Sequence, residues 1–178
     1  MLNTIFSDGE NGLMSSLNLQ LLSDKKKEGL FTALYIGALF IILAFVYYIH
    51  LSDNLWDSLV NFFTSLTLST VPTTGISLPV PANLANFGNL YVAAFQFSLG
   101  VGILEIIILA LRVFLHSSVT RIAETIENIV FWFGASYLII AYLVNMTISS
   151  EWFVFWAGII LIFGLALLAR AFVILARK

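Results

Sequence analysis

The sequence predicts an all-α integral membrane protein with four transmembrane helices and a re-entrant pore helix and loop between the first and the second. Hydrophobic residues make up 60% and charged residues 10% of the 178 positions, and the mean hydropathy is +0.99. These values lie outside the range of soluble domains. Apolar runs of the roughly 20 residues that cross a bilayer as a helix recur along the chain. A membrane is therefore the expected solvent.

The elements follow in order from the apolar runs and the polar stretches between them. Apolar residues spaced among polar ones in residues 1–28 predict an amphipathic segment that lies on the membrane surface. The expected spans are residues 29–51, 90–115, 129–148 and 152–169, the last running on to residue 175. The chain accordingly divides into the amphipathic segment 1–28, a helix–pore loop–helix module at 29–115, a cytoplasmic interfacial linker at 116–128 and a transmembrane helical hairpin at 129–178.

Lysine and arginine residues indicate the orientation, because cytoplasmic flanks are enriched in them. All of them flank the spans on one side: Lys25, Lys26, Lys27, Arg112, Arg121, Arg170, Arg177 and Lys178. We therefore expect a multi-pass protein of the cell membrane with both termini in the cytoplasm. The charges expected outside are Asp53, Asp57 and Glu151. Such an acidic face would concentrate cations, although short loops with few charges account for the same pattern.

The segment between the first two spans does not resemble an ordinary loop. Residues 55–68 are apolar and helix-like, but this run of about 14 residues is too short to cross a bilayer. The helix cannot continue past Pro72, and all three prolines of the chain lie between Pro72 and Pro81. A half-length helix followed by an extended polar stretch predicts a re-entrant pore loop, which requires a protein-lined cavity at membrane depth.

Such a loop would favour a cation. A pore helix that points its C-terminus inward presents the negative end of its dipole, and the backbone carbonyls that follow can replace the hydration shell of an ion. Thr73 and Thr74 add hydroxyl oxygens, and Gly75 lets the backbone turn its carbonyl without a side-chain clash.

Three stretches between Asp57 and Leu104 carry a resemblance to one helix–pore–helix repeat of the potassium transporters of the Trk, Ktr and HKT superfamily. They are DSLVNFFTSLTLSTVPTTGIS, NFGNL and QFSLGVGI. More loosely, the segment is similar to the pore of tetrameric potassium channels. The resemblance implies an ion filter formed by Thr73, Thr74, Gly75, Ile76 and Ser77, with the Gly75 carbonyl on the ion path. Because one repeat cannot surround an ion, several copies are needed, most naturally a homotetramer.

Glu105 is the one acidic residue deep in an expected span, and such a group faces a bundle interior or water rather than lipid. It could lie in an inner cavity and attract cations, or it could accept hydrogen bonds from a neighbouring helix or subunit. Arg112 and Arg170 lie near the cytoplasmic ends of their spans and are expected to extend to the lipid headgroups.

The predicted function is a cation channel or channel-like transport protein, with potassium as the expected ion and passive conduction through a pore formed by several copies. The alternative is a non-conducting structural or accessory subunit of a larger membrane complex. No metal-ligand cluster or nucleophile–base set indicates an enzyme. The chain lacks cysteine, which excludes disulfides and thiolate sites. A permeant monovalent cation such as K⁺ is the one expected ligand. The expected partners are the bilayer and further copies of the chain, and the net charge of −2 indicates no nucleic acid.

Overall fold

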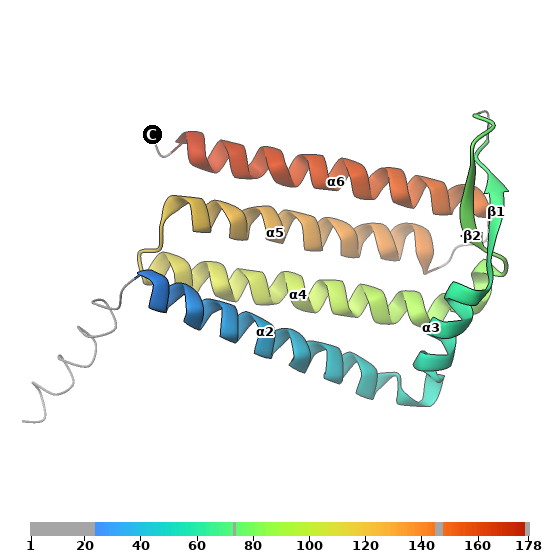
Figure 1. The fold of residues 1–178 in the computed structure, drawn as a ribbon, viewed down its shortest axis with the longest axis horizontal. Coiled ribbons are helices and arrows are strands. Elements are labelled where there is room, and N and C mark those ends of the chain that lie inside the picture. The colour runs from blue at the N-terminus through green and yellow to red at the C-terminus, as the bar shows by residue number, and fades with distance from the viewer. Residues whose placement is uncertain (1–23, 73, 145–147, 177–178) are drawn as a thin grey trace, which may run out of the picture.

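Four long helices form most of the computed structural model, which describes residues 24–72, 74–144 and 148–176. They are α2 (Asp24–Ile49), α4 (Gly88–Phe114), α5 (Val119–Leu138) and α6 (Ser149–Ala176). Figure 1 shows them side by side in chain order, with neighbouring helices running in opposite directions. Each is long and apolar enough to cross a membrane. The prediction of a mostly helical, multi-pass membrane protein is confirmed at this level.

The long helices are apolar on their outer sides as well as where they meet, as expected of helices that contact lipid. Ile160 and Phe172 on α6 are 73% and 68% exposed, whereas Ala166 on the same helix is buried. The buried side chains form one small cluster between α2 and α4 and a larger one where α4, α5 and α6 meet the segment that precedes α4. Lipid would therefore cover much of the apolar surface.

Small residues bring α5 and α6 close together. A Cβ added at Gly134 would overlap Cγ2 of Ile162, and one added at Gly158 would lie 2.9 Å from the methyl groups of Leu138. Each helix thus contributes a glycine that accommodates a branched side chain of the other. Membrane helices have no hydrophobic driving force to associate within lipid, so close packing of this kind contributes much of their affinity.

The connection between α2 and α4 lies across one end of the helical layer (Figure 1). It contains the 3₁₀ helix η1 (Leu51–Asp53), α3 (Leu55–Thr64), the strands β1 (Leu66–Thr70) and β2 (Ser77–Pro81), and the 3₁₀ helix η2 (Leu84–Phe87). The strands pair antiparallel, with Leu66 opposite Pro81 and Thr70 opposite Ser77. We call this end of the layer the hairpin end.

The β-hairpin corrects the expectation of an all-α chain. The sequence predicts an extended stretch after Pro72, and within it Pro79 and Pro81 occupy alternate positions of β2 whose backbone faces away from β1. They therefore remove no bond of the ladder. The structure also does not show α3 entering between the long helices, because α3 and the hairpin lie across their ends (Figure 1).

The amphipathic character of α3 suits this position. Trp56, Leu59 and Phe63 lie along one side of the helix and are exposed, whereas Ser58 and Asn61 lie on the other. A helix with opposed apolar and polar sides is typical of a membrane–water interface. Its 10 residues are too few to cross the bilayer.

Two other boundaries differ from the expected ones. Helix α5 begins at Val119, so most of the residues expected in the 116–128 linker form its first turns, and it continues into a π-helical turn, η3 (Ile139–Leu143). The amphipathic helix expected near the N-terminus falls mainly on residues 1–23, which lie outside the described part of the chain.

We expect Gly134→Ala to lower the stability of the helical layer. The added methyl group meets the branched Ile162 side chain, so the α5–α6 packing must shift, at a cost of about 1–3 kcal/mol. The matched control is Gly164→Ala on α6, where nothing lies within 4 Å of an added Cβ. Unfolding in mixed detergent micelles measures both variants. Equal stabilities would contradict close α5–α6 contact at Gly134.

Candidate functional site

Ion pairs join the long helices at the end opposite the hairpin, which we call the arginine end. Glu28 of α2 lies 3.6 Å from Arg112 of α4 and 3.5 Å from Arg121 of α5. Arg112 also donates a hydrogen bond of 2.6 Å to the backbone carbonyl of Arg121, and its guanidinium stacks over the Phe31 ring at 5.4 Å. These contacts connect the start of α2 to the end of α4 and the start of α5.

Arg170 extends the network to α6. Its guanidinium contacts Glu127 at 3.0 Å and Glu124 at 3.4 Å, and Glu124 also binds Arg121 at 2.9 Å. The expectation that Arg112 and Arg170 extend to the lipid headgroups is corrected, because both guanidinium groups turn toward carboxylates of neighbouring helices. In an apolar environment a charge is stabilised far better by a paired countercharge than by hydrocarbon.

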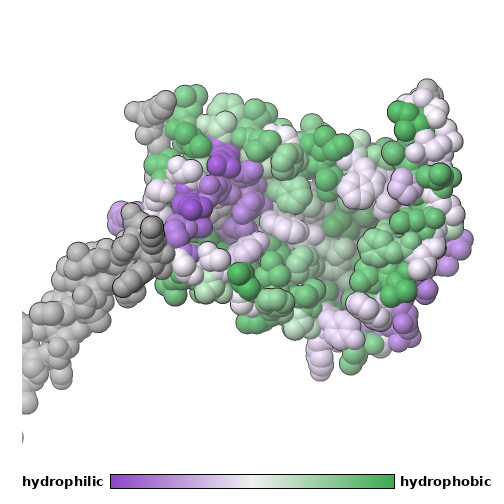
Figure 2. Space-filling model, in the orientation of Figure 1, coloured by the Kyte–Doolittle hydropathy of each residue, from purple (hydrophilic) through white to green (hydrophobic). Residues whose placement is uncertain are grey.

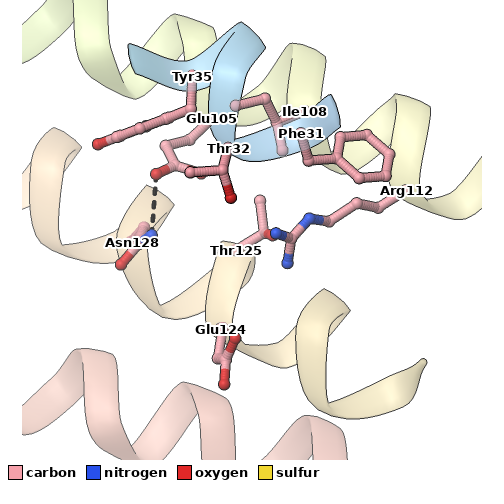
Figure 3. Close-up of a pocket in the computed structure, with 9 residues that line it drawn as sticks. All are labelled: Phe31, Thr32, Tyr35, Glu105, Ile108, Arg112, Glu124, Thr125 and Asn128. Carbon is pink, nitrogen blue, oxygen red and sulfur yellow. Dashed lines mark hydrogen bonds between the residues drawn. The ribbon is translucent and has the colours of Figure 1, made fainter. Parts of the chain in front are cut away.

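An open pocket of about 210 Å³ lies beside this network, lined by three helices (Figure 3). Helix α2 contributes Phe31, Thr32 and Tyr35, α4 contributes Glu105, Ile108 and Arg112, and α5 contributes Glu124, Thr125 and Asn128. Figure 2 shows hydrophilic residues gathered toward the arginine end, surrounded by hydrophobic ones. The cavity is thus a polar region within an otherwise apolar layer.

Glu105 is the most deeply placed charged group of this cavity. It is 2% exposed, and one carboxylate oxygen accepts a hydrogen bond of 2.9 Å from the Asn128 amide. Figure 3 shows the Glu105 side chain directed toward Asn128 and Thr32, while the Arg112 guanidinium lies beside Thr125. Among the described residues, Glu105 forms no salt bridge.

The hydroxyl groups that line the cavity have oxygen lone pairs available. Thr32 donates its hydroxyl proton to the Glu28 carbonyl and Thr125 donates to the Arg121 carbonyl, both at 2.9 Å. A hydroxyl oxygen that has donated its proton can still accept or coordinate through its lone pairs. Together with the Glu105 carboxylate, these hydroxyls give the pocket oxygen groups of the kind that hard cations prefer.

The expected filter residues lie elsewhere in the structure. Thr74, Gly75 and Ile76 lie in the turn between β1 and β2, and Ser77 begins β2; all four are exposed, and Thr73 is outside the described residues. Gly75 has a φ of +70°. Glu105 lies 17 residues after the start of α4 at the hairpin end, about 25 Å along the helix axis. The structure therefore does not bring the expected filter and Glu105 together within one chain.

Hydrogen bonds hold the turn in shape. The Val71 N–H donates to the Ile76 carbonyl at 2.7 Å, the Thr74 N–H donates to the Val71 carbonyl at 3.3 Å, and the Ile76 N–H donates to the Thr74 hydroxyl at 3.3 Å. The positive φ at Gly75 is one that other L-residues adopt only at a cost, so the turn by itself accounts for a glycine here.

Sequence reasoning found Glu105 but missed its surroundings. Thr32 and Tyr35 on α2, and Thr125 and Asn128 on α5, are pairs of polar residues three positions apart in helices that are otherwise largely apolar. Residues at this spacing share one side of a helix, so the spacing was a sequence signal for a polar side facing Glu105.

The sequence analysis also did not predict a cluster around His50. The buried His50 side chain contacts Asp53 at 2.7 Å and Gln96 at 3.0 Å, and it joins the end of α2 to α4.

No known protein family, curated protein or solved structure matches the chain. The resemblance of residues 57–104 to the Trk, Ktr and HKT transporters therefore stays a prediction. Within the described residues, no group of three or more histidine, aspartate and glutamate side chains is placed to hold a metal ion.

We expect Arg170→Gln to destabilise the arginine end by about 1–3 kcal/mol, because Glu127, whose side chain is 17% exposed, is left without its counterion. A double-mutant cycle with Glu127→Gln provides the control. The double variant, which lacks both charges, is expected to regain part of the stability that the Arg170→Gln variant loses. Thermal unfolding in detergent measures this stability. Strictly additive effects of the two substitutions would contradict the pairing.

Proposed function

We propose that the chain is a cation transport protein of the membrane, channel or channel-like, in which the Glu105 cavity binds a monovalent cation. One observation carries this proposal: Glu105 is almost completely buried, yet it lies outside the network that pairs Arg112, Arg121 and Arg170 with other carboxylates. An ionised carboxylate without a counterion is strongly unfavourable in a medium of low dielectric constant. A bound cation would balance the charge of an ionised Glu105.

The donor set favours a single positive charge. Glu105 supplies one carboxylate that lies outside the salt bridges, and the Thr32 and Thr125 hydroxyls supply neutral oxygens whose protons are donated to backbone carbonyls. A divalent cation usually requires more carboxylate ligands than this. Potassium is the ion that the resemblance of residues 57–104 implies, and its selection over sodium is part of the proposal.

Several copies would complete the conduction path, most naturally four around an axis. The cavity lies near the arginine end of one chain, and the turn with Thr74 and Gly75 lies at the hairpin end. An ion path between the two ends would therefore run along surfaces that copies share. The placement of the basic residues supports an arginine end in the cytoplasm, so that the cavity would open on that side.

The hairpin supports a second candidate, a non-conducting structural or accessory subunit of a larger membrane complex. Its specific support is that the turn geometry accounts for Gly75 without any ion, and that the neighbouring residues Thr74 and Ile76 are exposed. In this case Glu105 would hold a proton and serve the packing of α4 against α5 through its bond with Asn128.

Flux measurements separate the two candidates. We expect liposomes that contain the purified protein to take up rubidium or potassium, and Glu105→Gln to reduce this uptake at least about tenfold, equivalent to about 1.4 kcal/mol of barrier. The matched control is Asp57→Asn, the same chemical change at an exposed carboxylate of the hairpin end, with an expected reduction of about twofold at low salt. Absence of flux in the unaltered protein would exclude transport. Undiminished flux with Glu105→Gln would exclude the Glu105 site.

The role of the turn is tested separately. Under the transport proposal we expect Gly75→Ala to change the ratio of potassium to sodium flux, because the side chain disfavours the φ of +70° and turns the neighbouring carbonyls. Gly37→Ala on α2 is the control, since nothing lies within 4 Å of a Cβ added there. An unchanged flux ratio in Gly75→Ala would show that ions do not pass the turn.

A further inference from the structure

The two edges of the β-hairpin differ in what they can bind. Ladder bonds join the strands at alternate positions, as the bonds from Ala82 N–H to the Ser65 carbonyl and from Val71 N–H to the Ile76 carbonyl show at either end. In an antiparallel pair, the residues between these positions direct their N–H and C=O groups to the outer edges. Leu66, Leu68 and Thr70 therefore face the outer edge of β1, and three residues of β2 face the other edge: Ser77, Pro79 and Pro81.

The outer edge of β2 is closed to a further strand. Pro79 and Pro81 have no N–H to donate, and the Pro79 carbonyl already accepts a hydrogen bond of 3.0 Å from the indole nitrogen of Trp152 on α6. Prolines at an edge and a covering helix are two means by which proteins prevent unwanted strand pairing.

The outer edge of β1 has neither protection. Within the described chain, the backbone N–H and C=O groups of Leu66, Leu68 and Thr70 have no hydrogen-bonding partner in the protein. The Leu68 side chain is 77% exposed. A row of unpaired backbone groups beside an exposed apolar side chain is a template for strand addition.

We infer that β1 binds an extended, proline-free segment of a separate protein that carries basic side chains. Strand addition would pair the free N–H and C=O groups of β1 and place an apolar side chain of the partner against Leu68. The basic character follows from charge complementarity. The hairpin end carries Asp53, which contacts His50, as well as Glu151 and the exposed Asp57, and no lysine or arginine occurs in residues 28–111.

The geometry favours a separate protein over a second copy of this chain. In Figure 1 β1 lies on the side of the hairpin away from the helices, so its free edge faces outward from the helical layer. Two copies in one bilayer would direct these edges the same way rather than toward each other. Because the β2 edge is closed, a single strand completes the sheet. This docking site does not include Glu105 or the turn with Thr74 and Gly75.

A pair of synthetic peptides tests the inference. The first, about ten residues long, alternates threonine and valine with lysine at both ends, and its twin carries N-methyl groups on every second backbone nitrogen. Binding to the purified full chain in nanodiscs is measured by fluorescence anisotropy. We expect the first peptide to bind and the twin to bind at least about tenfold more weakly, because it cannot donate to β1. Failure of the first peptide to bind, or equal binding of both, would overturn strand addition.

Matched variants locate the site. Leu68→Pro removes an outward N–H from β1 and is expected to lose binding at least about tenfold, whereas Ser77→Pro makes the same change on the closed edge and leaves binding within about twofold. Equal effects of the two would overturn the assignment to β1. Replacing the lysines of the peptide with glutamate should weaken its binding at low salt. Unchanged binding would exclude the inference that the partner carries basic side chains. Leu68→Pro should retain cation flux, so this inference and the transport proposal fail separately.

Discussion

The structure depends on one constraint of the bilayer, that every backbone N–H and C=O group in hydrocarbon must be paired within the protein. The long helices satisfy this constraint with the backbone hydrogen bonds within each helix. The connection at residues 51–87 cannot, since it contains all three prolines and a hairpin with one unpaired edge. It accordingly lies across the hairpin end, where water or a partner can pair its backbone. A related cost, that of placing a charge in hydrocarbon, favours the arginine network near the opposite end of the helices and makes a buried carboxylate such as Glu105 exceptional.

Hydropathy alone predicts the spans because length and apolar content are local properties of a sequence. At the start of α5, local sequence properties do not predict the structure correctly. The helical spacing of Arg121, Glu124 and Glu127 predicts a short interfacial helix on the membrane surface, but their charges are paired with Glu28 and Arg170 of other helices. With their counterions supplied by tertiary contacts, these residues form the first turns of a long helix instead. A one-dimensional charge pattern cannot reveal that pairing.

The hairpin shows a different limit. Residues 66–81 contain the prolines and the TTG tripeptide that favoured a pore loop, and the same residues suit a hairpin once two strands are paired. Pro79 and Pro81 are tolerated because they lie two positions apart, so both face the outer edge of β2. At that edge the Pro79 carbonyl accepts a hydrogen bond from Trp152, which lies far away in the sequence. Each proline by itself signals a break, and only the register of the pair shows that neither interrupts a bond.

Glu105 combines what sequence can and cannot establish. A carboxylate in an apolar run signals a polar interior, and the structure provides a cavity around it. Arg112, two turns along the same helix, could have neutralised it, but its guanidinium is directed to Glu28 and to the Arg121 carbonyl. A fixed Glu105–Arg112 pair would have given a permanently neutral contact between helices. The arrangement observed instead leaves Glu105 outside the ion-pair network, with Asn128 as its hydrogen-bond partner, so its charge can be balanced by an exchangeable proton or, as proposed above, by a cation.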